Sequence, residues 1–408
     1  MSETLDAIVV GAGSAGLAAV REIGKRTDRF LLVNDGPYGT TCARVGCMPS
    51  KVLIEAANAF HKREIFDTMG IRGGAGLSVD LPAVLARVRA LRDDFVAGTL
   101  KLTDRLGDRS VAGRATILGP GRVEGAGRED RARSIVLATG SSPVVPKPWR
   151  AFGDRILTTD TLFEQQTLPG RIAVVGLGAI GVEIAQALSR LGVQVWGFDA
   201  AERLAGVADP KVEAVLREAL GGEFRFRTGV AVELAEAAGG IEVKAGDERV
   251  VVDKVLAAVG RRPNLAGLGL ETLGVKLDER GMPPVDPSTR RIGDLPVFLA
   301  GDANGDRALL HEAADEGHIA GLNAVAEEPL CFRRRTPLGV VFCAPNLATV
   351  GLRFDRFDAA TMIVGEADFR RQSRARMTSR DHGLARVYAD RESGRLLAAT
   401  MCVPEGEH

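Results

Sequence analysis

Residues 7–16 read Ala7-Ile8-Val9-Val10-Gly11-Ala12-Gly13-Ser14-Ala15-Gly16, an apolar run that leads directly into three spaced glycines. A stretch rich in Ala, Leu and Arg follows, and then a second apolar run, Phe30-Leu31-Leu32-Val33. Residues 171–198 repeat this arrangement, from Ile172-Ala173-Val174-Val175 to a second apolar run at Val193–Phe198. Apolar β-branched runs on both sides of a helix are typical of a parallel βαβ unit. The sequence therefore predicts an α/β fold with two such units.

The spacing of the glycines indicates what these units bind. In the pattern Gly-x-Gly-x-x-Gly, the first glycine makes the strand-to-helix turn, and the second lets the backbone approach a pyrophosphate. The third lets the helix pack on the strand. One match is weak evidence, but two matches that each lie between a strand and a helix are strong evidence. We expect two dinucleotide sites, one at Gly11, Gly13 and Gly16 and the other at Gly176, Gly178 and Gly181.

Selection of the ribose depends on the residue that ends the second strand of each unit. In the second unit this residue is Asp199, whose carboxylate suits a ribose 2′-hydroxyl and would repel a 2′-phosphate. We therefore expect the second site to prefer NAD over NADP. The nearby Arg203 is the residue that would weaken this preference. In the first unit the position is Asn34, followed by Asp35. Asn34 can hydrogen-bond a ribose hydroxyl but carries no charge.

Composition limits the possible partners and compartments. A chain of 408 residues is expected to form two or three domains. The 53 basic residues balance the 53 acidic ones and aromatic residues make up 5%, so neither nucleic acid nor an anionic membrane is expected as the main partner. No secretory signal or membrane-spanning apolar stretch is recognised, and five cysteines do not make a secreted disulfide framework. The expected location is cytoplasmic.

Hydrophobic patterning and proline-rich segments along the chain indicate its domain organisation. Leu81–Leu106 is predicted to be a charged amphipathic helix, and short strands are expected between Gly113 and Gly127. The proline-rich segment Pro143–Pro148 is predicted to be a linker, because several prolines in six residues do not fit a regular helix or a central strand. From about Thr336 the pattern becomes rich in strands.

Two cysteines, Cys42 and Cys47, follow the first glycine motif. Zinc would need two more ligands at short spacing, and Cys331, Cys343 and Cys402 are isolated. A structural disulfide would be unusual in a cytosolic chain. We interpret the pair as redox-active, since a helix expected to begin near residues 49–51 would stabilise a thiolate there.

The segment Gly39-Thr40-Thr41-Cys42-Ala43-Arg44-Val45-Gly46-Cys47-Met48-Pro49-Ser50-Lys51 resembles the redox-disulfide signature of the class I pyridine nucleotide–disulfide oxidoreductases. Within this family it is most similar to the dihydrolipoyl dehydrogenases. Three further segments resemble motifs of the family across nearly the whole chain: Ala138–Pro143 its ATG segment, Gly260–Asn264 its GRxPN motif and Phe298–Asp302 its second FAD motif.

The resemblance implies a role for each of these residues. Cys47 would face the flavin, Cys42 would meet the substrate disulfide, and Lys51 and Glu183 would form an ion pair beside the flavin. FAD would be bound by Gly11, Gly13, Gly16, Asn34, Asp35, Thr41, Lys51, Ala115, Thr139, Gly140 and Asp302. NAD would be bound by Gly176, Gly178, Gly181, Asp199, Val230 and Gly260. No metal site is expected.

The chain also departs from the family pattern. Thr40 replaces a usual glycine, which is expected to tighten the loop, and Arg44 replaces a usual asparagine. Arg44 would either lower a cysteine pKa or pair with an acid and be inert. Ala179 occupies the family's flavin-gating position in the second glycine motif and is too small to serve as an aromatic lid. The family's His-Pro-Thr…Glu segment would lie beyond His408, so we expect a chain that is truncated at its C-terminus; His61, His311, His318, His382 and His408 lie outside the matching context.

The implied architecture has two Rossmann-like domains, for FAD and NAD, and an incomplete α+β dimerisation domain. The expected boundaries are 1–148 for the FAD domain, 149–265 for the NAD domain, 266–333 for the return to the FAD and central region, and 334–408 for the dimerisation domain. The expected function is a homodimeric, FAD-dependent exchange of electrons between NAD(H) and a dithiol or disulfide, with lipoamide on a carrier protein as the substrate. The alternatives are a mercuric or other disulfide reductase, and a flavin- and NAD-binding protein without full turnover.

Overall fold

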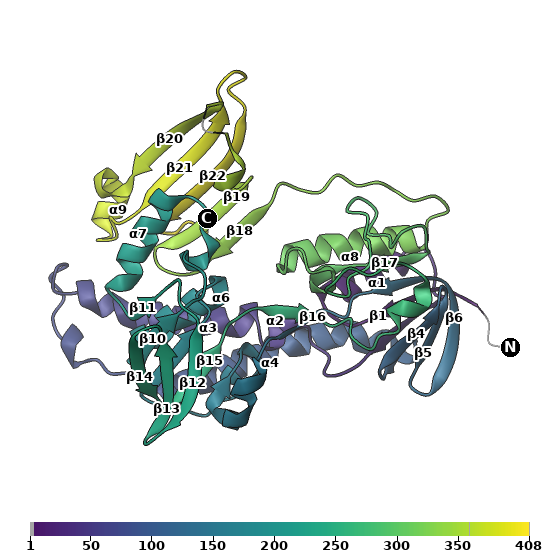
Figure 1. The fold of residues 1–408 in the computed structure, drawn as a ribbon, viewed down its shortest axis with the longest axis horizontal. Helices are drawn as coiled ribbons and strands as arrows, with labels where there is room; N and C mark the ends of the chain where they lie inside the picture. The colour runs from purple at the N-terminus through teal and green to yellow at the C-terminus, as the bar shows by residue number, and fades with distance from the viewer. Residues whose placement is uncertain (1–3, 359, 408) are drawn as a thin grey trace. The chain divides into compact units, whose positions relative to one another are not determined.

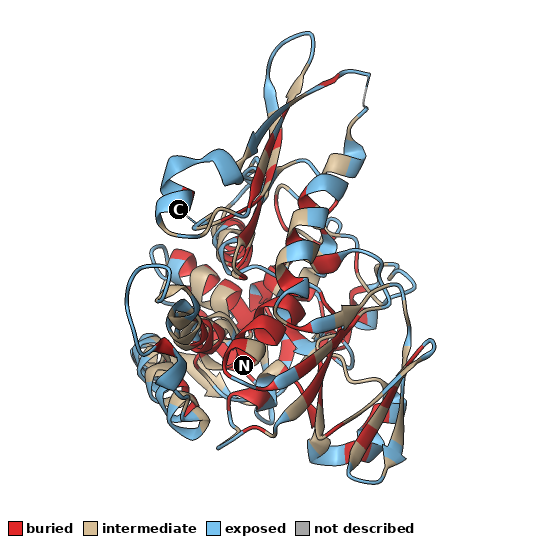
Figure 2. Cartoon of the chain, turned by 90° about the vertical axis from the view of Figure 1, so that its left-hand side faces the viewer, coloured by how far each residue is buried: buried red, intermediate tan, exposed pale blue. Residues whose placement is uncertain are grey.

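The computed structural model describes residues 4–358 and 360–407, which divide into two compact units. The first unit comprises residues 1–48, 92–142 and 261–335, and the second comprises residues 49–91, 143–260 and 336–408. His408 lies outside the described residues. Buried residues gather on the sheet strands and on the helices that flank them (Figure 2).

The first unit is built on a parallel sheet with strand order β3-β2-β1-β6-β17. An antiparallel hairpin, β4 and β5, extends it along β6 (Figure 1). The strands are β1 (Leu5–Val10), β2 (Phe30–Asn34), β3 (Ser110–Ala112), β4 (Ala115–Gly119), β5 (Arg122–Gly125), β6 (Arg128–Leu137) and β17 (Val297–Leu299). The central strands are apolar and buried on both faces, as a covered parallel sheet requires.

Helices α1 (Ser14–Ile23) and α8 (Leu310–Ala324) pack closely together in this unit (Figure 1). Glycines permit the close approach, because a Cβ on Gly317 would lie 2.1 Å from the Ala15 carbonyl oxygen and one on Gly321 would lie 2.6 Å from that of Ala19. The packing holds α8 beside the first glycine turn.

The second unit contains a parallel sheet with strand order β11-β10-β9-β15-β8. Its strands are β8 (Ile156–Leu157), β9 (Arg171–Val175), β10 (Gln194–Phe198), β11 (Arg225–Arg227) and β15 (Lys254–Ala257). Its helices are α5 (Thr159–Leu162), α6 (Ala179–Arg190) and α7 (Pro210–Gly221). An antiparallel sheet is formed by β12 (Val232–Ala237), β13 (Gly240–Ala245) and β14 (Glu248–Val252).

The C-terminal part of the second unit is an antiparallel sheet with strand order β18-β19-β22-β21-β20. Its elements are β18 (Leu338–Val341), β19 (Asn346–Gly351), β20 (Met362–Asp368), α9 (Ser373–Met377), β21 (Leu384–Asp390) and β22 (Leu396–Val403). One face of this sheet contacts α7, where Asp209 accepts hydrogen bonds from Arg386 and Tyr388. The predicted strand-rich character of this region is confirmed.

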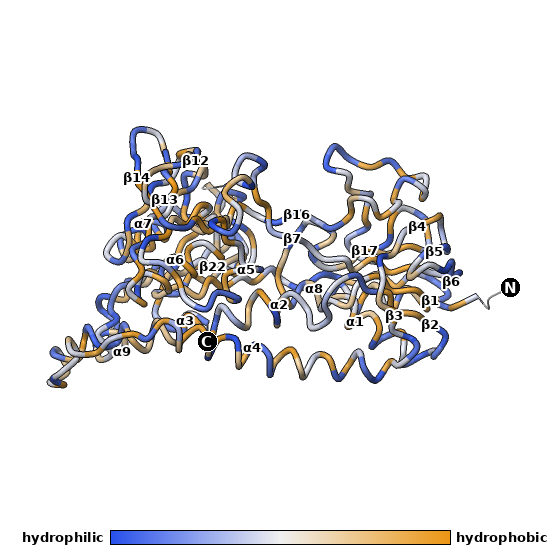
Figure 3. Tube along the Cα trace, turned by 90° about the horizontal axis from the view of Figure 1, so that it is seen from below, coloured by the Kyte–Doolittle hydropathy of each residue, from blue (hydrophilic) through white to orange (hydrophobic). Residues whose placement is uncertain are grey.

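Several local predictions can be compared with these elements. The predicted amphipathic helix is α4 (Leu81–Asp104), along which polar and apolar residues alternate (Figure 3). The helix expected to begin near residues 49–51 is confirmed as α3 (Cys47–His61), which begins two residues earlier, at Cys47, with Pro49 in its first turn. The linker prediction for Pro143–Pro148 is wrong in part. A short strand, β7 (Ser141–Pro143), ends there and a 3₁₀ helix (Lys147–Arg155) begins there, since proline suits both positions.

Candidate functional site

The first glycine motif forms the turn between β1 and α1. Gly11 has a φ of +104°, and a Cβ on it would lie 2.3 Å from the Ala138 carbonyl oxygen. A Cβ on Gly16 would lie 1.8 Å from the Gly11 carbonyl oxygen, so neither position accommodates a side chain. Gly13 is the residue before α1, and the helix N-terminus behind it offers backbone N–H groups to an anion.

Asn34 closes this turn from the end of β2. Its Oδ1 accepts the Ala12 N–H at 2.9 Å, and its Nδ2 donates to the Gly36 carbonyl at 3.0 Å. Asp35, the next residue, is exposed. The side chain predicted to select a ribose therefore also holds the glycine loop.

Thr139 and Gly140 lie at the end of β6, beside the same turn. Among residues 4–358 and 360–407, the Thr139 Oγ1 is one of two buried side-chain polar atoms without a hydrogen-bond partner. A buried unsatisfied hydroxyl costs about 1–3 kcal/mol unless something else binds it. Asn264 fixes the surrounding backbone, because its N–H donates to Gly140 O at 2.9 Å and its Nδ2 to Thr139 O at 3.0 Å. The unsatisfied hydroxyl and the bare glycine turn fit a bound dinucleotide.

Asp302 belongs to a short 3₁₀ helix (Gly301–Asn304) that follows β17. Its Oδ2 accepts a hydrogen bond from Ser141 Oγ at 2.8 Å. Arg261 orients this serine, because its Nε donates to Ser141 Oγ at 2.8 Å and its Nη2 to Ser141 O at 2.7 Å. Ala115, also predicted to contact FAD, is buried in β4.

The cysteine segment consists of a short helix, α2 (Thr41–Arg44), followed by the start of α3. Cys42 and Cys47 are both partly exposed, and Thr41 is exposed. The loop between the cysteines turns back tightly, since a Cβ on Gly46 would lie 3.2 Å from the Cys42 Cα. Cys47 is the first residue of α3, where the positive end of the helix dipole stabilises a thiolate.

Thr40 precedes α2 in a conformation that side chains rarely adopt, with φ 59° and ψ 149°. Its Oγ1 accepts the Ala43 N–H at 3.2 Å and so caps the short helix. The position needs a backbone that glycine adopts without cost, and the threonine compensates in part through this cap.

Lys51 and Glu183 form the predicted ion pair within the second unit, with Nζ and Oε2 2.8 Å apart. Glu183 is 6% exposed, and its Oε1 accepts the Phe342 N–H at 2.8 Å. The Lys51 ammonium also lies 4.4 Å from the centre of the Phe342 ring. Lys51 follows Cys47 by about one turn of α3, so the pair belongs to the helix that the second cysteine begins.

The second glycine motif repeats the geometry of the first between β9 and α6. A Cβ on Gly176 would lie 2.3 Å from the Ala258 carbonyl oxygen, and one on Gly181 1.8 Å from that of Gly176. Gly178 is the residue before α6. The second turn is therefore as closely packed as the first.

Asp199 directly follows β10, and both of its carboxylate oxygens accept backbone N–H groups. Its Oδ2 accepts the Leu177 N–H at 2.5 Å and its Oδ1 the Ala201 N–H at 2.8 Å. The Val230 N–H donates to the Asp199 carbonyl, which places Val230 beside this strand end. Arg203 is turned toward the Ala208 carbonyl, to which its Nη1 donates at 2.7 Å.

Gly260, the remaining predicted NAD contact, is exposed and has a φ of +108°. The structure thus brings Asn34 and Thr139 to the first glycine turn and Asp199 to the second, and it joins Lys51 to Glu183. It also shows residues that the sequence reasoning missed as parts of the site: Ser141, Arg261 and Phe342. Ser141 and Arg261 lie inside motifs already noted for their resemblance, which was the available signal.

Three of the histidines lie on helices. His61 is partly buried at the end of α3, where burial and then Arg190 lower its pKa. His311 and His318 both lie within α8, and His318 Nδ1 is 3.0 Å from Glu22 Oε1.

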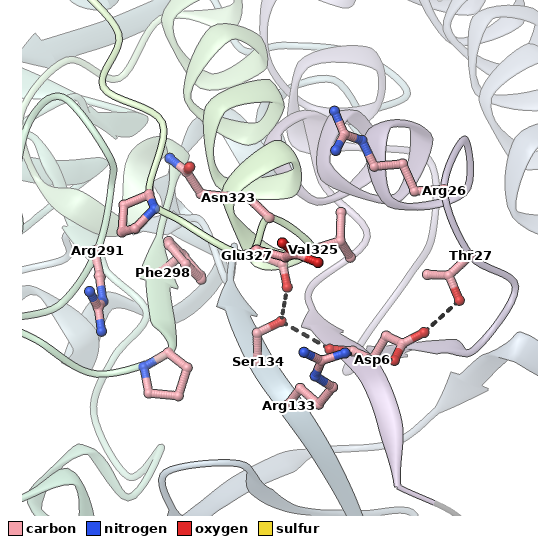
Figure 4. A pocket seen from close by; sticks show the side chains of 14 residues that line it. Asp6, Arg26, Thr27, Arg133, Ser134, Arg291, Phe298, Asn323, Val325 and Glu327 are labelled. Atoms are coloured by element: carbon pink, nitrogen blue, oxygen red, sulfur yellow. Dashed lines mark hydrogen bonds and ion pairs between the residues drawn. The ribbon is translucent and has the colours of Figure 1, made fainter.

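A cavity of about 350 Å³ lies at the opposite, amino-terminal ends of β1 and β6 (Figure 4). Arg26, Arg133 and Arg291 reach it from three segments. The Ser134 hydroxyl is satisfied by the carbonyls of Asp6 and Ala324. Ligands of open parallel sheets bind beyond the carboxyl ends of the strands, so this cavity is separate from the dinucleotide site.

The fold and these two glycine turns define a class of protein, the oxidoreductases with two dinucleotide-binding folds. Residues 5–317 match the family model described as pyridine nucleotide-disulphide oxidoreductase, and residues 338–408 match the dimerisation domain of the same family. The chain belongs to the pyridine nucleotide–disulphide oxidoreductases. It is an enzyme that uses FAD and NAD and catalyses flavin-dependent disulfide oxidoreduction.

Curated relatives agree with this assignment. Dihydrolipoyl dehydrogenase of Thermus scotoductus is 33% identical, over 99% of this chain and 88% of its own length. Dihydrolipoyl dehydrogenase 2 of Haloarcula marismortui is 31% identical, over 98% of this chain and 87% of its own length.

The fold of this chain is also similar to those of solved structures. LpdA from Mycobacterium tuberculosis has 26% identity and a TM-score of 0.87, covering 98% of this chain and 91% of that one. The flavoprotein disulfide reductase RclA from Escherichia coli, at 22% identity and a TM-score of 0.84, covers 98% of this chain and 90% of that one and shares the fold. In the described part of the chain, no helix is long and apolar enough to cross a membrane.

Proposed function

We propose that this chain is a dihydrolipoyl dehydrogenase that passes electrons from dihydrolipoamide on a carrier protein to NAD⁺. The observation that carries the proposal is the cysteine pair, with Cys42 on α2 and Cys47 at the start of α3, and the Lys51–Glu183 ion pair about one turn further along α3. The names of the curated relatives support lipoamide as the substrate. The dimerisation domain supports a homodimer, and a cytoplasmic location stays a prediction.

The cysteines perform the dithiol chemistry. A substrate thiolate attacks Sγ of Cys42, the Cys42–Cys47 bond breaks, and Cys47 leaves as a thiolate that the N-terminus of α3 stabilises. The second substrate thiolate then attacks the substrate sulfur of the mixed disulfide, which closes the lipoamide ring and releases the Cys42 thiolate. Two electrons have passed to the cysteine pair, and the two thiol protons are released.

FAD, when bound, supplies the two-electron relay between the cysteine pair and NAD⁺. The residues that would hold it are those at the first glycine turn, together with Thr139 and Asp302. The Lys51 ammonium would lie beside the flavin and Glu183 would hold it there. The second glycine turn and Asp199 would hold NAD⁺.

Anaerobic reduction with NADH, followed by absorption spectroscopy, tests the cysteine assignment. We expect a long-wavelength band from the Cys47 thiolate at the flavin. The band should be lost in Cys47→Ser and kept in Cys331→Ser, which changes an exposed cysteine outside the pair. Flavin bleaching without the band in the unmodified protein would refute the assignment. Faster NADH-dependent reduction of oxidised glutathione than of lipoamide would overturn the proposed substrate.

A further inference from the structure

Glu316 is the most deeply buried carboxylate near the second FAD motif. It lies in α8 and is 1% exposed. Its Oε2 accepts the Gly301 N–H at 2.8 Å and a hydrogen bond from Asn304 Nδ2. Both donors belong to the 3₁₀ turn that carries Asp302, so the carboxylate holds this turn from behind.

The other carboxylate oxygen of Glu316 faces two guanidinium groups. Arg334 Nη1 donates to Oε1 at 2.8 Å, and Arg290 Nη1 lies 3.5 Å from it. Arg290 is 5% exposed and has a φ of +65°, while its N–H and carbonyl tie it to Asp286 and Leu299. Burial raises the pKa of Glu316, and the charge of Arg290 opposes this shift.

The four donors around Glu316 determine which side chain fits there. An ionised carboxylate accepts from both sides at once, whereas a glutamine has one oxygen and one NH₂ group. The two guanidinium charges would attract the amide oxygen. Its NH₂ group would then point at the donors of Gly301 and Asn304, and the turn would lose its acceptor.

We propose that Glu316 is a positioning residue for the flavin, because its carboxylate fixes the Gly301–Asn304 turn and thereby the Asp302 side chain. Asp302 is fixed on its other side by Ser141, so two separate contacts define where its carboxylate lies. The inference rests on the proposed role of Asp302 in binding FAD. It predicts that flavin affinity depends on a residue that does not itself touch the cofactor.

The test compares Glu316→Gln with a matched control, Glu312→Gln. Glu312 lies one turn earlier on α8, is 4% exposed and also binds Arg334, but its second hydrogen bond is with Arg307 and not with the Gly301–Asn304 turn. The dissociation constant of FAD is measured by fluorescence on apoprotein prepared from the holoenzyme, together with the thermal midpoint of each apoprotein. Both variants should lose similar thermal stability, since each disturbs a buried ion pair with Arg334.

We expect the dissociation constant of FAD to rise about tenfold or more in Glu316→Gln and to change less than about threefold in Glu312→Gln. Equal effects in both variants, or no effect in Glu316→Gln, would overturn the inference. If Glu316→Gln does not fold, Asn304→Asp replaces it, because this change turns the donor on Glu316 into a repelling carboxylate and keeps the acceptor for the Asp306 N–H. Unchanged FAD affinity in Asn304→Asp would likewise overturn the inference. Failure of the unmodified protein to bind FAD would instead refute the proposed function.

Discussion

Replacing Thr40 with glycine should stabilise the protein, although it removes a side chain that makes a hydrogen bond. Thr40 has φ 59° and ψ 149°, close to a region of backbone space that is populated almost only by glycine. Holding another residue there costs about 1–3 kcal/mol. Glycine removes this strain but loses about 0.5–1 kcal/mol to the greater freedom of the unfolded chain. Loss of the cap on Ala43 costs a few tenths of a kcal/mol more.

The strain is isolated by comparing Thr40→Gly with Thr40→Ala, because both variants lose the cap and alanine alone keeps a Cβ. Urea unfolding should place the glycine variant above the alanine variant by about 1–3 kcal/mol. The alanine variant should fall below the unmodified protein by about 1 kcal/mol. A glycine variant that is no more stable than the alanine variant would show that Thr40 is not strained.

Three further outcomes are expected. Gly16→Ala should abolish FAD retention, because its Cβ would lie 1.8 Å from the Gly11 carbonyl oxygen. The control Gly98→Ala, in an open helical position, should instead stabilise the protein by about 0.5–1 kcal/mol. Retained FAD in Gly16→Ala would contradict the packing argument. The ratio of kcat/KM for NADH to that for NADPH should favour NADH and should fall by about tenfold in Asp199→Asn, and a preference of the unmodified protein for NADPH would refute the ribose argument. Hydrogen bonds from Ser288 and Thr289 lower the pKa of Asp286 to about 2 from 3.8, so the stability they give is present above about pH 4 and is lost as the pH falls toward 2. Because Asp286 is exposed, Asp286→Asn should cost no more than about 1 kcal/mol at neutral pH and progressively less as the pH falls through about 2, which acid titration of unfolding checks against a pH-independent difference.

The two glycine turns could be predicted from the sequence because their cause is local. A glycine is required wherever a Cβ would meet backbone within the same strand-turn-helix unit, and the spacing of the glycines records this. Lys51 and Glu183 are far apart in the sequence, and only the family resemblance joined them. The conformation of Thr40 runs against the preference of its own side chain, so the residue type does not predict it; the available signal was the glycine that the family usually has at this position.

The ion pairs of α8 were missed for a different reason. Glu312 and Glu316 follow one another on a helix with the spacing of ordinary solvent-exposed acids. Their burial depends on Arg290 and Arg334, which reach them from other segments. Charge pattern alone does not distinguish a solvated helix face from a buried network, because the difference lies in the tertiary packing.

Comparison of the two strand-end residues changes the argument about nucleotide choice. Asn34 and Asp199 both accept the N–H of the residue after the first glycine, so holding the loop is a task that an amide and a carboxylate share. They differ in their second contact. The Asn34 side chain donates to the carbonyl of Gly36, two residues further on. The Asp199 side chain instead accepts the N–H of Ala201, also two residues further on. An amide suits the first setting and a carboxylate the second, so the local backbone by itself accounts for the choice of residue at each position.

The negative charge of Asp199 is therefore no proof of selection for a ribose 2′-hydroxyl. It still repels a 2′-phosphate, and the guanidinium of Arg203 donates its hydrogen bond to the Ala208 carbonyl. We therefore still expect a preference for NAD, which would follow from that charge whatever requirement placed it there.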